Sequence, residues 1–150
     1  VDKVLSILGD EWVIAIKLHP YLHEKFTCSD ENAHRMIDCS SEDINDVLPV
    51  TSFLVTDYSS VIFEASILRI PMAFFVFDLE KFIKIRDFHH DFKAFIPGPM
   101  ARTDEEIAKI VKEGRIDQSV IEEFRKKNFG DTLGHACENI KSLTKNLMNE

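Results

Sequence analysis

Short, uninterrupted apolar runs separated by segments with helical spacing constrain the fold of this chain more than any other feature. Four such runs predict strands, at Glu11–Leu18, His34–Cys39, Phe53–Thr56 and Pro71–Phe77. Because apolar residues follow one another instead of alternating with polar ones, the strands are expected to be buried on both faces. Strands that alternate with helices in this way predict an α/β fold with a parallel sheet covered by helices on both faces. We place the phenylalanines at positions 74, 75 and 77 in the core.

The segments around these strands carry helix signals. Gly9 suits a C-terminal helix cap, and Thr103 with Glu106 forms a capping-box pattern. Ser40 and Ser41, followed by acidic residues, are expected to cap the helix after the second strand. Helices are predicted at residues 2–8, 40–48, 61–70, 79–85, 103–112, 118–128 and 135–148, with loops at 21–34 and 86–100. No repeat or linker divides the chain, so residues 1–150 are predicted to form one domain.

The chain has 26 acidic and 18 basic residues and a net charge of −8. This balance argues against nucleic acid or an anionic membrane surface as its main partner, because both attract a basic face. No apolar stretch is long enough to span a membrane, and the first residues lack the pattern of a signal peptide. The three cysteines show no paired spacing and indicate reduced thiols of a cytoplasmic protein. Because the chain starts at Val1 instead of Met, we expect it to be a piece of a longer one.

The segment from Phe53 to Pro71 is the strongest candidate for a binding site. A buried strand leads through a polar turn into a helix that starts near Ser59 and Ser60, which leaves backbone N–H groups free at one spot. These groups, the positive end of the helix dipole and two hydroxyls suit a phosphate, with an ordinary helix cap as the alternative. In parallel α/β sheets ligands bind beyond the carboxyl ends of the strands, where His19 is also expected to lie.

Three stretches of the chain resemble, in order, the signature of a known family. They are Lys17-Leu18-His19-Pro20, Thr56-Asp57-Tyr58-Ser59-Ser60-Val61-Ile62-Phe63-Glu64 and Pro97-Gly98-Pro99. The family is that of the CDP-glycerol glycerophosphotransferases, the teichoic acid primases and polymerases, and residues 134–140 are similar to a weaker motif near its end. The resemblance implies a GT-B architecture of two Rossmann-like domains, of which this chain is the C-terminal one. It implies CDP-glycerol as the donor, no metal or other cofactor, and an absent N-terminal half with the acceptor contacts and another catalytic histidine.

The resemblance also implies roles for individual residues. His19 is the expected catalytic residue, which hydrogen-bonds the pyrophosphate and, when its imidazole is protonated, stabilises the charge that grows on the CMP leaving group. The alternative is a histidine at a strand end that caps a loop carbonyl. Ser59 and Ser60 are expected to bind the pyrophosphate. Glu64 lies one turn beyond Ser60 and is expected to accept hydrogen bonds from the ribose hydroxyls, with a solvated surface charge as the alternative. Asp57 is expected to orient the turn or cap the helix.

Further binding residues are expected around these. Ile37 and Ser40 flank the end of the second strand, where backbone groups can contact the base, and Arg86 is a candidate fork donor to a phosphate. The alternative for Ile37 and Ser40 is a packing role, and the alternative for Arg86 is a surface residue of an exposed loop. No metal site is expected at His89-His90-Asp91, because adjacent residues seldom converge on one ion.

Two residues depart from the family pattern. Asp87 stands where the family has glycine, which puts the loop near the donor in doubt, and Leu133 stands where an aspartate precedes Gly134.

The function predicted from the resemblance is the donor-binding half of a transferase in teichoic acid or related cell-wall polymer synthesis. It moves glycerol phosphate from CDP-glycerol to a lipid-linked or polymer hydroxyl acceptor, and the fragment alone is expected to be inactive. Nucleic acid is not an expected partner. The expected location is the cytoplasm, with the full-length protein associated peripherally with the inner face of the membrane. The alternatives are the C-terminal domain of a sugar-nucleotide glycosyltransferase and a non-catalytic Rossmann-like interaction module.

Overall fold

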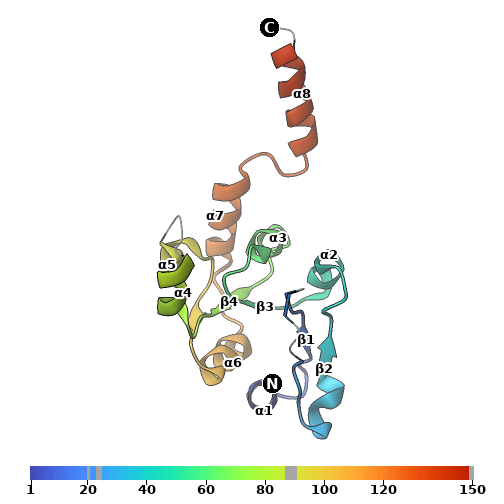
Figure 1. Cartoon of the computed structure of the whole chain (residues 1–150), viewed down its shortest axis with the longest axis vertical. Helices are drawn as coiled ribbons and strands as arrows, with labels where there is room; N and C mark the ends of the chain where they lie inside the picture. The colour runs from blue at the N-terminus through green and yellow to red at the C-terminus, as the bar shows by residue number, and fades with distance from the viewer. Residues whose placement is uncertain (20, 23–24, 87–90, 149–150) are drawn as a thin grey trace.

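A computed structural model of the chain describes residues 1–19, 21–22, 25–86 and 91–148 (Figure 1). Its β strands all pair in parallel, in a two-stranded sheet β1-β2 and a three-stranded sheet β3-β4-β5. The elements, in chain order, are α1 (Asp2–Leu8), β1 (Ile14–Ile16), the 3₁₀ helix η1 (Asp30–Arg35), β2 (Met36–Asp38), α2 (Ile44–Val47), the 3₁₀ helix η2 (Leu48–Val50), β3 (Leu54–Thr56), α3 (Val61–Ile67), β4 (Met72–Phe75), α4 (Leu79–Arg86), α5 (Phe92–Phe95), β5 (Met100–Ala101), α6 (Asp104–Glu113), α7 (Gln118–Phe129) and α8 (Ala136–Met148). The predicted parallel α/β fold is confirmed, with its strands divided between two sheets.

Strand β4 lies at the centre of the three-stranded sheet and is covered on both faces. Met72 and Phe74 point into the largest core cluster, which includes buried residues of α3, α4, α5 and α7. Ala73, between them, packs on the other side with Ala101 of β5 and Ile107 of α6. Helices therefore cover both faces of this strand, as its continuous apolar run predicts.

The predicted core position of Phe77 is wrong. Phe74 is 0% exposed, but Phe77 is 65% exposed and Phe75 is only partly buried. The ladder between β4 and β5 ends at the pair Phe75 and Ala101, so the chain leaves the sheet before it reaches Phe77. The apolar run in the sequence continues to Phe77, past the last residue paired in the sheet, so the run by itself does not show which phenylalanine is the last buried one.

The helix after β2 also differs from the prediction. Helix α2 begins at Ile44, and its N-cap is Asp43, whose side chain accepts a hydrogen bond of 2.8 Å from the amide of Asn45. Ser40 and Ser41 therefore do not cap this helix. The segment 86–100, predicted to be a loop, contains the last residue of α4, helix α5 (Phe92–Phe95) and the start of β5 at Met100, whereas residues 96–99 form no helix or strand.

Helix α1 packs against α6, although about a hundred residues separate them in the chain. Leu8 shares a buried cluster with Ala108 and Val111 of α6. Two polar contacts join the same helices, from Lys3 Nζ to Glu105 Oε1 at 2.6 Å and from Lys112 Nζ to the carbonyl of Ile7 at 2.7 Å.

Arg35 fixes the end of α1 to the approach of β1. Its guanidinium group is buried, with the residue only 6% exposed. It donates to the carbonyls of Trp12 at 3.1 Å and Leu5 at 3.4 Å, and also to that of Gly9. A buried cation with several acceptors satisfies carbonyl groups that the end of a helix leaves without intrahelical partners.

Helix α8 projects away from the rest of the chain (Figure 1), and all its residues are exposed. Ile140, Leu143 and Leu147 lie on one side at helical spacing and are 60–64% exposed. Among the helices of the described residues, none is long and apolar enough to cross a membrane.

Candidate functional site

The loop between β3 and α3 carries the two serines of the predicted phosphate site. Ser59 and Ser60 are both exposed. The hydroxyl of Ser59 accepts a hydrogen bond of 3.3 Å from the amide of Val61, whereas the Ser60 side chain makes no capping hydrogen bond. The carbonyl of Ser60 accepts from the amide of Phe63 at 3.0 Å and starts the helix. The loop thus presents its hydroxyls to solvent at the carboxyl end of β3.

His19 lies three residues beyond β1 and is exposed. Its Nδ1 accepts a hydrogen bond of 3.3 Å from the amide of Tyr21, and the two rings lie 5.1 Å apart. In the neutral imidazole this arrangement leaves the proton on Nε2, so that Nε2–H is the group that can donate to a ligand. The adjoining Pro20 of the predicted motif is outside the described residues.

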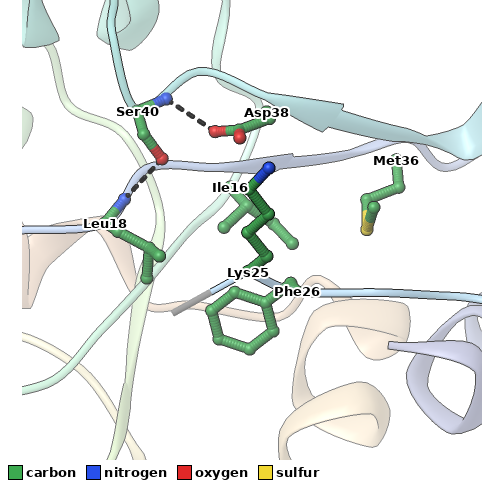
Figure 2. Close-up of a pocket in the computed structure, with 7 residues that line it drawn as sticks. All are labelled: Ile16, Leu18, Lys25, Phe26, Met36, Asp38 and Ser40. Atoms are coloured by element: carbon green, nitrogen blue, oxygen red, sulfur yellow. Dashed lines mark hydrogen bonds between the residues drawn. The ribbon is translucent and has the colours of Figure 1, made fainter. Parts of the chain in front are cut away.

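Ser40 joins the ends of β1 and β2. Its hydroxyl accepts from the amide of Leu18 at 3.3 Å, and its own amide donates to Asp38 Oδ1 at 2.9 Å (Figure 2). The hydrogen bonds from Ser40 lower the pKa of the Asp38 carboxyl, and the charge of Lys25 adds to the effect. Ser40 therefore holds the edge of the two-stranded sheet in place while Asp38 remains ionised near neutral pH.

A pocket lies against this pair of strands (Figure 2). It is a shallow hollow lined by Ile16, Leu18, Lys25, Phe26, Met36, Asp38 and Ser40. Its wall combines an aromatic ring and aliphatic groups with a carboxylate, an ammonium group and a hydroxyl. Ile37, which was predicted to flank a base, is 52% exposed in β2 and does not line the pocket.

The other predicted binding residues, Asp57, Glu64 and Arg86, are exposed and belong to different elements of the fold. Asp57 precedes Tyr58 in the loop, Glu64 lies in the first turn of α3, and Arg86 is the last residue of α4. Within the described ranges no hydrogen bond or ion pair links Arg86 to Ser59 or Ser60, and none links His19 to them. The structure thus brings His19 and Ser40 to the ends of one sheet, and residues 57–60 to the end of the other.

Two residues without a predicted binding role, Tyr58 and Asp78, lie beside the candidate site. The hydroxyl of Tyr58 donates to Asp78 Oδ1 at 2.8 Å, which joins the ends of β3 and β4. Burial raises the pKa of the Tyr58 hydroxyl, and the hydrogen bond to Asp78 raises it further, so the tyrosine stays protonated at neutral pH. The sequence signal for this residue was an aromatic side chain in an otherwise polar turn.

The segment around the predicted family departure at Asp87, together with His89 and His90, is outside the described residues. Asp91, which is described, caps α5 by accepting a hydrogen bond of 3.0 Å from the amide of Lys93. Over residues 1–19, 21–22, 25–86 and 91–148, no group of three or more histidine, cysteine or acidic side chains could hold a metal ion.

Comparisons with known proteins agree on one family. A family-wide profile described as CDP-glycerol:poly(glycerophosphate) glycerophosphotransferase matches residues 1–143. A teichoic acid poly(ribitol-phosphate) polymerase of Bacillus spizizenii is 37% identical over 140 residues, which are 93% of this chain and 23% of that protein. A teichoic acid poly(glycerol phosphate) polymerase of Bacillus subtilis is 36% identical over 107 residues, which are 71% of this chain and 14% of the relative.

Solved structures that resemble this chain include those of a teichoic acid polymerase. The wall teichoic acid polymerase TagF superposes with a TM-score of 0.75 at 28% identity, over 97% of this chain and 37% of the TagF chain. A TagF variant soaked with CDPG superposes with a TM-score of 0.72 at 28% identity, over 97% of this chain and 38% of that one. The chain thus spans less than half of the length of the proteins that it matches.

Proposed function

Because the chain belongs to the CDP-glycerol:poly(glycerophosphate) glycerophosphotransferase family, we propose that it is the donor-binding domain of a transferase. The substrate is CDP-glycerol, and the acceptor is a hydroxyl of a lipid-linked or polymeric chain in teichoic acid or related cell-wall polymer synthesis. Residues 1–150 form one Rossmann-like domain in this proposal, and the acceptor contacts belong to another part of a longer GT-B protein. The observation that carries the proposal is the exposure of Ser59 and Ser60 at the carboxyl end of β3.

The diphosphate of the donor binds at this loop. The hydroxyls of Ser59 and Ser60 face solvent at the start of helix α3, where the positive end of the helix dipole favours a phosphate. Hydrogen bonds to a charged acceptor contribute about 1.5–3 kcal/mol each, whereas repulsion from exposed charges of the chain, whose net charge is −8, is largely screened beyond about 10 Å at 0.1 M salt. Arg86 adds a cation at the end of α4.

In the reaction, the oxygen of the acceptor hydroxyl attacks the β-phosphorus of CDP-glycerol and forms a phosphodiester. The bond between that phosphorus and the bridging oxygen breaks, CMP leaves with the bonding electron pair, and the hydroxyl proton is released. His19 is the catalytic residue on the donor side, where Nε2–H donates to an oxygen of the leaving phosphate and stabilises its growing charge. Holding the diphosphate in one orientation lowers the barrier further.

The nucleoside binds between the two sheets' carboxyl ends. Ile37 and Ser40 contact the base, and the position of Ser40 where the ends of β1 and β2 are joined supports this placement. Glu64 accepts hydrogen bonds from the ribose hydroxyls, because it lies one turn into α3 and is exposed. Asp57 shapes the turn that precedes the serines.

Calorimetry on the 150-residue chain tests the site. Titration with CDP-glycerol and with CDP is expected to show weak binding, which His19→Ala and Ser60→Ala each reduce by about tenfold or more. Ser142→Ala, which changes an exposed serine of α8, is the matched control and is expected to bind as the unmodified chain does. Unchanged affinity in both site variants would refute the assignment of these residues.

The same titration separates the alternatives. Tighter binding of UDP than of CDP would favour a sugar-nucleotide glycosyltransferase domain. No thermal shift with any nucleotide would favour a non-catalytic module, because a ligand well above its dissociation constant stabilises the folded state. Since relatives include ribitol-phosphate as well as glycerol-phosphate polymerases, CDP-ribitol is compared with CDP-glycerol.

The full-length protein acts at the inner face of the membrane in this proposal, where a lipid-linked acceptor is available. The net charge of −8 does not favour binding of this chain to anionic lipid. The proposal therefore assigns peripheral membrane attachment to the other part of the protein. A liposome flotation assay that compares this chain with the full-length protein tests the assignment.

A further inference from the structure

The hydroxyl of Tyr58 joins two loops at the same edge of the three-stranded sheet. It donates to Asp78 Oδ1 at 2.8 Å. Tyr58 follows β3 by two residues, Asp78 follows β4 by three, and the two strands pair in parallel up to Thr56 and Phe74. No backbone ladder continues beyond these residues, so this side-chain contact connects the strands after their own pairing has ended.

The ring of Tyr58 also makes contacts, with two phenylalanine rings. It stacks on Phe82 of α4 with the ring centroids 3.8 Å apart and an angle of 23° between the planes. The edge of a second ring, Phe92 of α5, meets it at a centroid distance of 5.4 Å. The edge-to-face pair with Phe92 has the geometry that contributes beyond the area that it buries. Tyr58 is therefore in contact with the segment after β4, with α4 and with α5.

The residues next to Tyr58 in the turn are more exposed to solvent than Tyr58 is. Asp57, Ser59 and Ser60 are exposed, so Tyr58 is the inward-pointing side chain of the four-residue turn. The turn's own hydrogen bonds, from Val61 to the Ser59 hydroxyl at 3.3 Å and from Phe63 to the Ser60 carbonyl at 3.0 Å, lie on its helix side. On the side toward β3, the ladder with β4 ends at Thr56, and the hydroxyl of Tyr58 is the next contact with the segment that follows β4.

We propose that Tyr58 and Asp78 form a positioning pair that sets the orientation of the Ser59 and Ser60 donors and thereby the affinity for the donor diphosphate. The inference rests on the proposed function in assigning that ligand to the loop. Neither residue contacts the ligand in this proposal. The pair instead reduces the number of conformations that the loop loses on binding, which is the general way in which preorganisation increases affinity.

The test uses Tyr58→Phe, which removes the hydroxyl and keeps the ring. Its matched control is Thr51→Val, because Thr51 lies three residues before β3 and its hydroxyl donates to the carbonyl of Val47 at 2.9 Å. Each variant loses one hydroxyl hydrogen bond from the segment around β3, and they differ in which end of the strand is affected. Backbone amide order parameters of Ser59 and Ser60 in the ligand-free chain, and the dissociation constant for CDP, are measured for both.

In Tyr58→Phe the order parameters of the two serines are expected to fall from about 0.85 toward 0.6, and the dissociation constant for CDP to rise about five- to tenfold. In Thr51→Val both quantities stay as in the unmodified chain. Unchanged affinity in Tyr58→Phe, with or without a change in the order parameters, would overturn the inference while CDP binding by the unmodified chain still supports the proposed function. Absence of CDP binding by the unmodified chain would remove both.

A second pair of variants decides the question if Tyr58→Phe fails to fold. Asp78→Asn keeps an oxygen that can accept from the Tyr58 hydroxyl, whereas Asp78→Ala does not. Rescue of CDP affinity by asparagine relative to alanine is expected. Equal affinity of these two variants would show that the hydrogen bond has no part in positioning the loop.

Discussion

Gly98, in the Pro97-Gly98-Pro99 stretch, is the position where a single methyl group is expected to do the most damage. An ideal Cβ at this residue would lie 2.2 Å from the carbonyl oxygen of Met72 and 3.1 Å from its carbonyl carbon. Real Cβ atoms are essentially never found closer than 3.0 Å to such a neighbour. Because Met72 belongs to the buried central strand β4, the segment that leads into β5 has to move instead.

The structure allows the cost of Gly98→Ala to be worked out. An ordinary contact begins at 3.4 Å, so β5 has to retreat by about 1.2 Å from β4. This movement strains the hydrogen bonds from the amide of Phe74 to the carbonyl of Pro99 at 2.9 Å and from that of Val76 to Ala101 at 2.8 Å. With about 1 kcal/mol for each hydrogen bond and about 1–3 kcal/mol for overpacking, the free energy of unfolding falls by about 3–5 kcal/mol.

Urea denaturation and thermal melting, both followed by circular dichroism, measure this loss. For a chain of this size a loss of about 3–5 kcal/mol lowers the melting temperature by about 6–20 °C. The control is Gly114→Ala, where φ is +60° but the nearest atom to a new Cβ is the carbonyl oxygen of Val111 at 3.9 Å. Backbone strain alone is expected to cost about 1 kcal/mol there. If Gly98→Ala is no more destabilising than Gly114→Ala, the close approach to Met72 does not constrain the fold.

Two further predictions concern charged groups near α1. Hydrogen bonds from Asn32 and Ser29 lower the pKa of Asp2 below its ordinary value of 3.8 in the folded chain, so the unfolded chain binds the proton more tightly. The stability that Asp2 contributes is therefore fully present above pH 3.8 and is lost as the pH falls through the lower pKa of the folded chain. Urea midpoints measured from pH 6 to 2 are expected to fall less steeply for Asp2→Asn, and an identical slope would contradict this. Arg35→Leu leaves three backbone carbonyls without their buried donor and is expected to lower the free energy of unfolding by about 2–4 kcal/mol, whereas a loss below about 1 kcal/mol in urea would show that the guanidinium is dispensable.

The parts of the fold that local sequence encodes were predictable. Continuous apolar runs are typical of strands covered on both faces, and β4 is covered in this way. The capping pattern at Thr103 is also confirmed, since its hydroxyl accepts from the amide of Glu106 at 3.2 Å at the start of α6. Such signals act within one turn or one strand, so they do not depend on the rest of the chain.

Features that depend on distant partners were not predictable. β5 is two residues long and is defined by its register with β4, which no periodicity within Met100–Ala101 indicates. Ser40 was predicted to cap a helix, but tertiary contact with Leu18 uses its hydroxyl instead. For the candidate site, sequence placed Ser59 and Ser60 at the end of a strand, whereas the contact between Tyr58 and Asp78 that joins this loop to the next strand could only be found in three dimensions.

The packing of α1 on α6 bears on how the chain is synthesised. Leu8 completes its cluster only with Ala108 and Val111, which leave the ribosome about a hundred residues later. Helix α1 therefore lacks the cover that α6 gives to Leu8 until residues 108–111 have also been translated. A nascent chain that ends before residue 108 is expected to leave this side of α1 exposed and to engage chaperones, whereas one that includes α6 can pack it against α1.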